Sequence, residues 1–413
     1  MKSVCIISQS LYEFDARVKR KAEALAAAGY DVDVLTLRTS TEKRFVRNGV
    51  NVHTISLGKR RSSLPRYAFE YVVFFVWAFV RVTFMMWRKR YAVVDVNTLP
   101  DFLIFAPILA RMMGATLVLD MHEITPEFYM SKYGIAEDSW LIRLIKFLER
   151  ASFDFADRVM TVNEPIQDLL ISRGLPRSKS LVLMNAADDA RFSSPALRAT
   201  EDKSEARTAK ETKPFAMMYH GTLTRIYGLD IAVEAFEIAR RDMPDAELWI
   251  LGLGPEQDTL RRLVEARGLS SQVKVVGPVP SSEVPQWLAR CDAGILPMRR
   301  DVFLDYAFPN KLSEFIVSGR PVLVSRLRTM RHYFSDQALA YFDPNDAEDL
   351  ARRMIQLYRD RELRTQLAAK ALEEYAPIRW ELMKQRYLHL IDGIANPLRS
   401  LSATPVAIGP AKD

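Results

Sequence analysis

The chain has 413 residues, 49% of them hydrophobic and 26% charged, and this length favours two domains over a single hydrophobic core. Its formal net charge of +7 indicates an anionic partner, which could be a nucleotide phosphate, a lipid headgroup or a nucleic acid. The sequence contains no nucleic-acid recognition motif, and its two cysteines and five histidines lack metal-ligand spacing, so neither a nucleic-acid-binding protein nor a zinc protein is expected.

The chain opens with a β-α-β pattern. A short apolar strand over Ser3–Ile7 precedes an amphipathic helix over Asp15–Ala28, and a second strand follows at Asp31–Thr36. This order predicts a parallel sheet, and the lack of a G-x-G-x-x-G sequence removes the main support for a dinucleotide site. Taken alone, Asp15 is expected to cap the helix and Arg17 to lie exposed on its first turn. No signal peptide precedes the first strand and both cysteines lie in apolar runs, so a cytosolic protein with reduced thiols is expected.

The segment Tyr67–Trp87 is rich in phenylalanine, methionine and tryptophan, with basic clusters on both sides at Lys59–Arg61 and Arg88–Arg90. It is long enough to span a bilayer, but Glu70 and Arg81 lie inside it, and charged side chains are costly at membrane depth. Two alternatives remain open. The segment is either a helix of the first domain that lies partly on an anionic membrane face, or a fully buried helix.

Polar residues follow a buried strand in the middle of the first half. Strands are expected at Ala92–Val96 and Ala115–Asp120, with a helix over Asp101–Met113 between them. The second of these strands ends at Asp120, and His122 and Glu127 come soon after it. Ligands of open α/β sheets bind at the carboxyl ends of the strands, so this run is a candidate site. A lone histidine is more often structural, but His122 has several carboxylates close in sequence.

The rest of the first half continues the alternation of helices and strands. Helices are expected at 140–156 and 165–173, and strands at 158–162 and 181–184. A charged stretch that is poor in apolar residues follows at 198–213, and its composition predicts a solvated linker between two domains.

The second half repeats this pattern. A strand at 215–220 leads into a loop where Gly221 would let the backbone approach a phosphate and Arg225 could clamp one. The final residues, 400–413, lack periodicity and are expected to be disordered. Further helices and strands are expected at 229–240, 247–251, 291–297, 347–374 and 380–391.

The most informative stretch is Phe308–Val322. Pro309 and Asn310 mark a loop, a short helix begins near Lys311, and a glycine and a proline then precede a buried strand. The first turn of such a helix presents free backbone N–H groups and a positive dipole end, which favour a phosphate. Lys311 adds a cation, and Glu314 can accept hydrogen bonds from two ribose hydroxyls. The alternative is a surface helix with an exposed Lys–Glu pair.

This stretch resembles the nucleotide-sugar signature of the retaining GT-B glycosyltransferases of family four. The resemblance covers nearly the whole chain and implies an α/β fold of two Rossmann-like parallel-sheet domains that face a central cleft. Family members carry two glutamates eight positions apart; Glu314 corresponds to the second, which holds the ribose, and the first falls on Tyr306. The implied domains are residues 1–197, with a return helix at 378–396, on the acceptor side, and residues 214–376 on the donor side.

The resemblance also assigns roles in the first half. Asp15 and Arg17 match a helix start that faces the cleft on the acceptor side. Asp120 and His122 match a motif whose histidine contacts the transferred sugar, and Glu127 closes that motif as a supporting or acceptor-side group. The implied catalytic set is therefore Asp120, His122 and Glu127.

In the second half the resemblance implies a donor site. Val279 lies on the loop whose backbone would read the nucleotide base. Neither a metal nor a cofactor other than the donor is expected, because basic side chains and the helix start would neutralise the leaving diphosphate. The other implied donor-binding residues are Pro309, Asn310, Lys311, Glu314, Gly221 and Arg225.

The expected function is transfer of a sugar from a nucleoside-diphosphate sugar with retained anomeric configuration. The aromatic segment favours a lipid-linked saccharide acceptor, as in polysaccharide or glycoconjugate assembly, and a peripheral location on the inner face of the cell membrane. Two other functions stay open. One is a nucleotide-sugar epimerase of the same fold, and the other is a membrane-associated scaffold without catalysis, which Tyr306 would favour.

Overall fold

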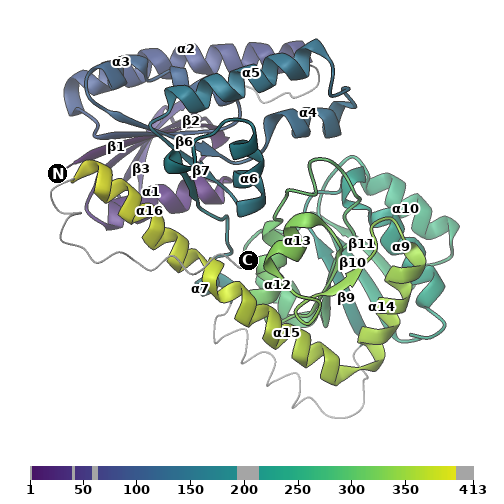
Figure 1. Cartoon of the computed structure of the whole chain (residues 1–413). Coiled ribbons are helices and arrows are strands. Elements are labelled where there is room, and N and C mark those ends of the chain that lie inside the picture. Colours follow the sequence, from purple (N-terminus) through teal and green to yellow (C-terminus); the bar gives the residue numbers. More distant parts are fainter. Residues whose placement is uncertain (1, 40–41, 58–63, 193–213, 397–413) are drawn as a thin grey trace. The chain divides into compact units, whose positions relative to one another are not determined.

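The computed structural model describes residues 2–39, 42–57, 64–192 and 214–396, and it divides the chain into two compact units (Figure 1). The first unit comprises Met1–Leu183 and Met383–Asp413, and the second comprises Met184–Leu382. The predicted linker at 198–213 and the predicted disordered tail at 400–413 lie outside the described residues.

The first unit ends after Leu183, whereas the sequence places the domain boundary at residue 197. The difference arises because the segment after the last strand of the first sheet already packs with the second unit. The backbone N–H of Ala187, for example, donates a hydrogen bond to the hydroxyl of Tyr375 at 3.1 Å.

An eight-stranded sheet forms the core of the first unit, in the order β3-β4-β2-β1-β5-β6-β7-β8. Every neighbouring pair is parallel except β3 with β4. The central strands are nearly continuous buried apolar runs, as expected for a parallel sheet with helices on both faces. The strands are β1 (Ser3–Leu11), β2 (Asp31–Leu37), β3 (Arg44–Arg47), β4 (Val50–Ile55), β5 (Val93–Asn97), β6 (Thr116–Met121), β7 (Arg158–Thr161) and β8 (Ser180–Val182).

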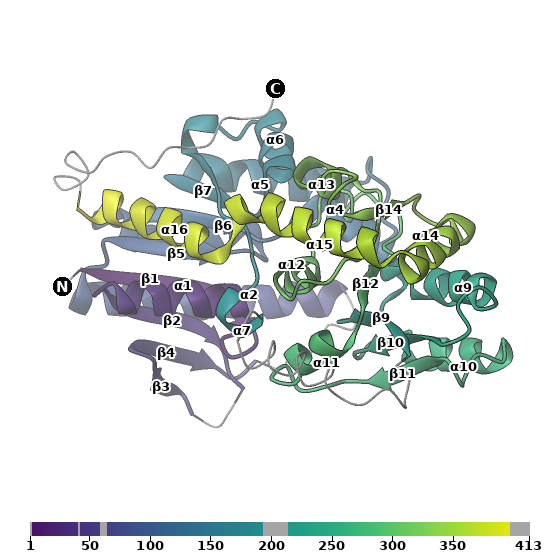
Figure 2. The ribbon, with the colours of Figure 1, turned by 90° about the horizontal axis from the view of Figure 1, so that it is seen from below.

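Helices cover both faces of this sheet. They are α1 (Ala16–Ala27), α2 (Leu64–Lys89), α3 (Ile108–Met112), α4 (Thr125–Tyr133), α5 (Trp140–Phe155), α6 (Glu164–Ser172) and α16 (Trp380–Ala395), with single turns η1 (Asp101–Phe105) and η2 (Arg177–Lys179). Helices α2, α3 and α5 lie on one face, and α1 and the chain's last helix, α16, lie on the other (Figures 1 and 2). Asp15 caps α1 by accepting the N–H of Val18 at 3.1 Å, as predicted, but Arg17 is 3% exposed and the expectation of an exposed side chain is wrong.

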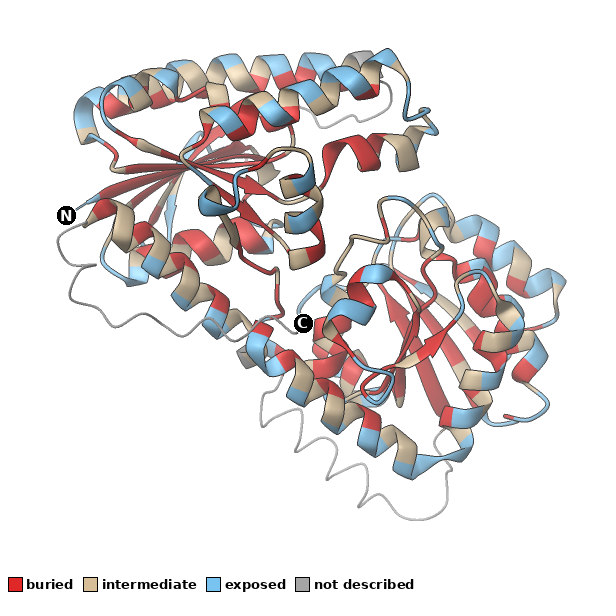
Figure 3. Cartoon of the chain, in the orientation of Figure 1, coloured by how far each residue is buried: buried red, intermediate tan, exposed pale blue. Residues whose placement is uncertain are grey.

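Helix α2 carries two apolar stripes, and buried and exposed positions alternate along it (Figure 3). The buried stripe is Tyr67, Tyr71, Phe74, Ala78, Val82 and Met86, and the exposed stripe is Phe69, Val72, Val76, Val80, Phe84 and Trp87. By length and composition, the segment Arg66–Lys89 could cross a membrane. In its most apolar stretch of 18 residues, 33% is buried in the structure. The hypothesis of a fully buried helix is therefore wrong for the first unit.

The second unit contains a six-stranded sheet in the order β11-β10-β9-β12-β13-β14, with every neighbouring pair parallel. Its strands are β9 (Phe215–His220), β10 (Ala246–Leu251), β11 (Val273–Gly277), β12 (Ala293–Leu296), β13 (Val322–Ser325) and β14 (Ala340–Phe342). Its helices and turns are α7 (Asp189–Phe192), η3 (Arg225–Tyr227), α9 (Leu229–Ala239), α10 (Gln257–Ala266), α11 (Val284–Arg290), α12 (Asn310–Val317), α13 (Arg328–Tyr333), α14 (Ala347–Arg359), α15 (Arg361–Tyr375) and η4 (Ala376–Ile378).

Several predicted elements differ from the structure. Strand β1 continues to Leu11, and the sequence prediction misses β3 and β4. Strand β3 is short, with an arginine at each end, and lies at the edge of the sheet, so its sequence carries little strand signal. The helix expected over 101–113 is two short elements, η1 and α3, with Pro107 between them. The helix expected over 347–374 is also two helices, because the carboxylate of Asp360 accepts the N–H of Leu363 at 2.8 Å and starts α15.

Gly294 lets α12 pack directly on β12. A Cβ at this position would lie 2.6 Å from the ring of Phe315, which is fully buried on α12. Gly294→Ala is therefore expected to lower the free energy of unfolding by about 1–3 kcal/mol, as overpacking of a core does, and chemical denaturation measures this. The matched control is Gly393→Ala in α16, where a Cβ meets open space and better helix propensity raises stability by about 1 kcal/mol. Equal losses in both variants would contradict the packing argument.

Candidate functional site

The first candidate site lies at the carboxyl edge of the sheet in the first unit. Asp95 and Asn97 belong to the end of β5 and Asp120 to the end of β6, and all three are fully buried. Arg17 and Lys21 reach them from successive turns of α1. The Nε and Nη2 atoms of Arg17 donate to the two oxygens of Asp120 at 2.9 and 2.7 Å. The ammonium of Lys21 donates to Asp95 at 3.0 Å and also to Asp120.

Charge balance makes this buried cluster possible, because two cations face two carboxylates. Burial opposes the ionisation of Asp120, but Arg17 and Lys21 outweigh it and hold the pKa of Asp120 well below its ordinary value. Tyr387 of α16 closes the cluster by donating its hydroxyl hydrogen to Asp95 at 2.7 Å. Burial, then the charge of Asp95, raises the pKa of Tyr387 well above its ordinary value, so Tyr387 remains a neutral donor.

His122 follows β6 at the same edge, and its side chain is 19% exposed. Its Nε2 atom lies 2.9 Å from the side-chain oxygen of Asn97 and 3.2 Å from Asp120. Its backbone N–H donates to the hydroxyl of Thr98 at 3.0 Å. The structure thus brings Arg17, Asp120 and His122 together, and Asp15 begins the helix that carries Arg17.

Glu127, on α4, belongs to a different cluster. Arg173, which follows α6, donates to both oxygens of Glu127 and lies 3.5 Å from Glu149 of α5. In the same region Asp101 accepts the hydroxyl hydrogen of Thr125 at 2.8 Å. Across the described residues no hydrogen bond or ion pair joins Glu127 to Asp120 or His122, so the predicted catalytic set is divided between two groups.

The second candidate site lies at the carboxyl edge of the sheet in the second unit, where α12 begins. Pro309 precedes this helix, and no side-chain hydrogen bond caps its N-terminus. The Nζ atom of Lys311 lies 3.0 Å from the hydroxyl of Tyr219 and 4.0 Å from the ring centre of Tyr227. Burial lowers the pKa of Lys311 to about 8, although Glu314 opposes the shift.

Gly221 and Glu314 border Lys311. Gly221 has a φ of +129°, which strains any residue with a side chain, and a Cβ there would lie 2.9 Å from the end of the Lys311 side chain, which would have to shift. Glu314 lies one turn into α12, with a carboxylate oxygen 3.4 Å from Nε2 of His220 at the end of β9. Burial, then Lys311, lowers the pKa of His220 to about 3, so His220 is neutral in this site.

Comparisons with known proteins fit this arrangement. The family described as glycosyl transferases group 1 matches residues 200–374, and the family described as glycosyl transferase 4-like domain matches residues 15–186. The chain belongs to the GT-B glycosyltransferases of family four. Among curated proteins it is 23% identical over 290 residues to the sulfoquinovosyl transferase SQD2 of Arabidopsis thaliana, a match that spans 68% of this chain and 52% of that protein.

Solved structures show the same GT-B fold. HepE of Anabaena, crystallised with UDP, matches with a TM-score of 0.69 and 16% identity over 95% of this chain and 100% of that chain. WaaG, a glycosyltransferase involved in lipopolysaccharide biosynthesis, also matches with a TM-score of 0.69, at 17% identity over 94% of this chain and 100% of that chain.

The remaining predicted residues of this glycosyltransferase lie in loops and turns of the second unit. Arg225 is exposed on η3, and its carbonyl accepts a hydrogen bond from Arg299 at 3.1 Å. Val279 is half-buried in the loop after β11. Tyr306, which replaces the first glutamate of the family pair, lies with its ring 5.1 Å from the guanidinium carbon of Arg328. Their functional roles stay predictions.

Sequence analysis does not identify five residues that belong to the two sites. Asp95 and Asn97 could have been found, because they end a predicted strand just as Asp120 does. Lys21 lies four residues after Arg17 and so on the same helix face, which is a weaker signal. Nothing in the local sequence links His220 to Glu314, or Tyr387 of α16 to a strand nearly three hundred residues earlier.

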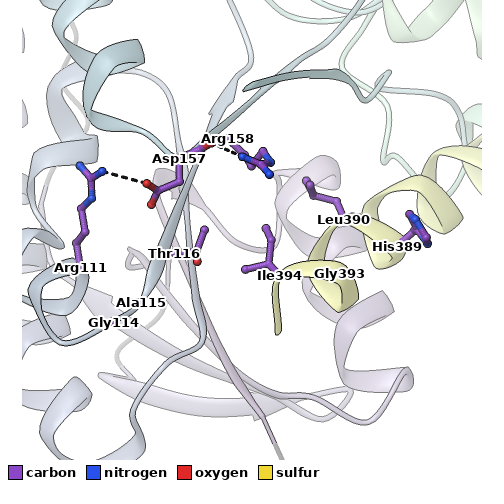
Figure 4. A pocket seen from close by; sticks show the side chains of 10 residues that line it. All are labelled: Arg111, Gly114, Ala115, Thr116, Asp157, Arg158, His389, Leu390, Gly393 and Ile394. Carbon is purple, nitrogen blue, oxygen red and sulfur yellow. Dashed lines mark hydrogen bonds and ion pairs between the residues drawn. The ribbon is translucent and has the colours of Figure 1, made fainter. Parts of the chain in front are cut away.

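The glycosyltransferase also has a cavity of about 730 Å³ at the opposite edge of the first sheet, where β6 and β7 begin (Figure 4). Arg111 and Asp157 pair at 3.0 Å on one side of it, and His389 and Ile394 of α16 line another side. None of the predicted site residues lines this cavity. Among the described residues, no group of three or more His, Cys, Asp and Glu side chains is placed to hold a metal ion.

The carboxyl groups near Glu127 predict a pH-dependent stability. Burial raises the pKa of Asp101 to about 7, although Thr125 opposes the shift, and burial raises that of Glu149 to about 8, although Arg173 opposes it. Because an unfolded aspartate titrates near about 4, the folded chain holds a proton that the unfolded chain releases, and stability falls as the pH rises from about 4 to about 7. Asp101→Asn should therefore reduce the loss of melting temperature between about pH 5 and about pH 8. Asp154→Asn, an exposed position on α5, is the control, and an unchanged pH profile in Asp101→Asn would contradict this assignment.

Proposed function

We propose that this glycosyltransferase moves a sugar from a nucleoside-diphosphate sugar to an acceptor with retained anomeric configuration. One observation carries the proposal. Lys311 lies at the uncapped start of α12, beside Gly221 and two tyrosine rings, and Glu314 follows one turn later. A cation next to free helix N–H groups suits a diphosphate, and a carboxylate one turn away suits the hydroxyls of a ribose.

The proposed chemistry needs a stabilised leaving group and no protein nucleophile. The leaving phosphate takes the proton of the acceptor hydroxyl on the same face of the sugar. Lys311 and the N-terminus of α12 stabilise its charge. His122 of the first unit contacts the transferred sugar. Arg17 is buried against Asp120 and the carbonyl of Leu183, so its proposed role is to hold this edge of the sheet in place.

Donor binding tests the proposal. Purified protein is titrated calorimetrically with a panel of nucleoside diphosphates and their sugars. One of them should bind, and Glu314→Ala should weaken it by about tenfold or more, because charged hydrogen bonds to the ribose are lost. Affinity should also fall above about pH 8, because Lys311 loses its proton there and a bound diphosphate no longer meets a cation.

The control for this experiment is Glu265→Ala, an exposed glutamate at the far end of α10. It should leave affinity unchanged. If no nucleotide binds, or if Glu314→Ala and Glu265→Ala behave alike, the donor site is not where we propose it.

We further propose that the acceptor is lipid-linked and that the enzyme lies on the inner face of the cell membrane. The exposed stripe of α2 supports this, since six apolar side chains face outward along one helix. Helix α5 lies on the same face of the sheet and adds exposed Trp140, Leu144 and Phe147 (Figure 1). Exposed apolar patches of this extent mark interaction surfaces.

Charge supports a membrane as the partner of this face. Arg88 and Arg90 are exposed at the end of α2, and Arg143 and Arg150 are exposed on α5. Basic side chains beside an apolar helix face are attracted to anionic lipid headgroups. The involvement of WaaG in lipopolysaccharide biosynthesis adds support from a protein of the same fold.

Vesicle sedimentation tests the membrane proposal. The protein should bind vesicles of phosphatidylglycerol and phosphatidylcholine more tightly than phosphatidylcholine alone. Replacing Phe84 and Trp87 by glutamate should weaken binding by about tenfold or more, because each aromatic side chain contributes about 1.5–3 kcal/mol when buried. Val46→Glu, at an equally exposed position on β3, is the control. Equal binding by all three proteins would contradict a membrane role for α2.

One observation favours a second function, a scaffold without catalysis. Tyr306 occupies the place of a family glutamate, and the guanidinium of Arg328 lies over its ring. Such a protein would bind membranes without binding any nucleotide sugar, so the calorimetric and vesicle experiments together separate the two functions. An epimerase would bind the donor and convert it without an acceptor.

A further inference from the structure

The cavity at the amino edge of the first sheet, where its parallel strands begin, has the size of a small-molecule site. Its volume of about 730 Å³ falls within the range of about 300–1,000 Å³ that is usual for ligand pockets. All of its lining residues belong to the first unit and come from α3 and the loop after it, from the starts of β6 and β7, and from α16 (Figure 4). The residues assigned to the proposed reaction lie at the carboxyl edges of the two sheets, so a ligand of this cavity would not contact them.

A glycine of α16 keeps one wall of the cavity open. Gly393 lines the cavity, and among the described residues a Cβ at this position would meet no atom within 4 Å beyond its own stretch of helix. Glycine is a poor helix former compared with alanine, and close packing does not require it here. What Gly393 provides is space inside the cavity.

The lining of the cavity carries more positive than negative charge. Two arginines, Arg111 and Arg158, face one aspartate, Asp157. The carboxylate is already satisfied, because Arg111 donates to one oxygen at 3.0 Å and the backbone N–H of Leu117 donates to the other at 2.8 Å. Arg111 is engaged as well, since it donates to the carbonyl of Phe155 at 2.6 Å and lies over its ring. The surplus positive charge therefore belongs to Arg158.

Arg158 retains N–H groups that can bind a ligand. One of its five N–H groups donates to the backbone carbonyl of Asp157 at 2.9 Å, and within the described residues its guanidinium forms no ion pair. The side chain of Arg158 extends from β7 toward α16, whereas Arg111 lies on the far side of Asp157 (Figure 4). Arg158 is thus placed to bind an anion that enters between β7 and α16.

The other side chains of the lining are partly polar and partly apolar. Thr116 and His389 add groups that form hydrogen bonds. Leu390 and Ile394 are four positions apart, so they lie on the same face of α16 and form an apolar wall. A molecule that matches this lining has an anionic group at one end and an apolar body at the other.

We propose that this cavity binds a small organic anion, a molecule with one phosphate or carboxylate group and an apolar body. Arg158 binds the anionic group, because the planar fork of a guanidinium fits two oxygens of either group. The apolar body packs on Leu390 and Ile394, in the space that Gly393 leaves. This binding site goes beyond the proposed function and does not depend on it.

Nitrogen NMR of the histidine side chains tests the proposal. The probes are phenyl phosphate and benzoate, each of which joins one anionic group to a ring, and phenol is the neutral control. The chain has five histidines, of which His389 alone lines the cavity, so the spectrum of the 15N-histidine-labelled protein reports where a probe binds. His389→Gln assigns its signal. At constant pH and millimolar concentration, at least one of the two anions should shift this signal along a saturating curve, and phenol should bind about tenfold more weakly.

Two substitutions test how the anion is held. Arg158→Gln should weaken binding by about tenfold, because the charged hydrogen bonds to the anion are lost. Gly393→Leu should abolish binding, because the leucine side chain fills the cavity, and the fold should be kept because leucine is a better helix former than glycine. Arg143→Gln removes another exposed arginine, on α5, and is the matched control, which should bind like the wild type.

Three results would overturn the proposal. They are no shift of the His389 signal by either anion, equal binding of phenol, and a shift that persists unchanged in Arg158→Gln or Gly393→Leu. Phenyl phosphate that binds at the proposed donor site would instead shift the signal of His220, which lies 3.4 Å from Glu314. A shift of the His220 signal alone would therefore contradict the cavity site and leave the proposed function standing.

Discussion

The carboxyl edge of the first sheet depends on a buried lysine. Lys21 is fully buried, and an ammonium in that position is stable only because Asp95, Asn97 and Asp120 all accept its hydrogens. Those three residues come from two neighbouring strands, so the same contacts fix α1 over the sheet. Tyr387 extends them to α16, which ties the last helix of the chain to the first sheet. The geometry around His122 is a consequence of this charge balance.

Helix α2 shows why apolar composition alone does not assign a helix to the core. One stripe, including Phe74 and Val82, packs inward at 0% exposure, while the opposite stripe, including Phe84 and Trp87, stays at the surface. A helix that is apolar all round is normally covered on every side or in a membrane. In the first unit only one side of α2 is covered, so its exposed stripe is available to pack against a partner.

Sequence patterns predicted the two parallel sheets, α12 and the polar strand ends, because these depend on local periodicity and on the general rule for ligand sites in open sheets. They failed where the orientation of a side chain depends on contacts with residues far away in the sequence. The periodicity of α1 gave no sign that Arg17 turns inward to Asp120, 103 residues away. Glu127 follows His122 closely in sequence but turns to Arg173, because α4 begins between them. Neither outcome could be derived without the packing of the helices on the sheet.

The cations at the carboxyl edges of the two sheets differ in how they are paired. This difference is the reason why we propose that the diphosphate binds to the second unit. Arg17 and Lys21 are already neutralised by Asp120 and Asp95, so an anion placed there would have to displace a buried carboxylate. Lys311 instead faces two aromatic rings and a hydroxyl, and it has no ion pair within the described residues. Burial without a full counter-charge lowers its pKa to about 8, and an arriving diphosphate would supply the missing charge.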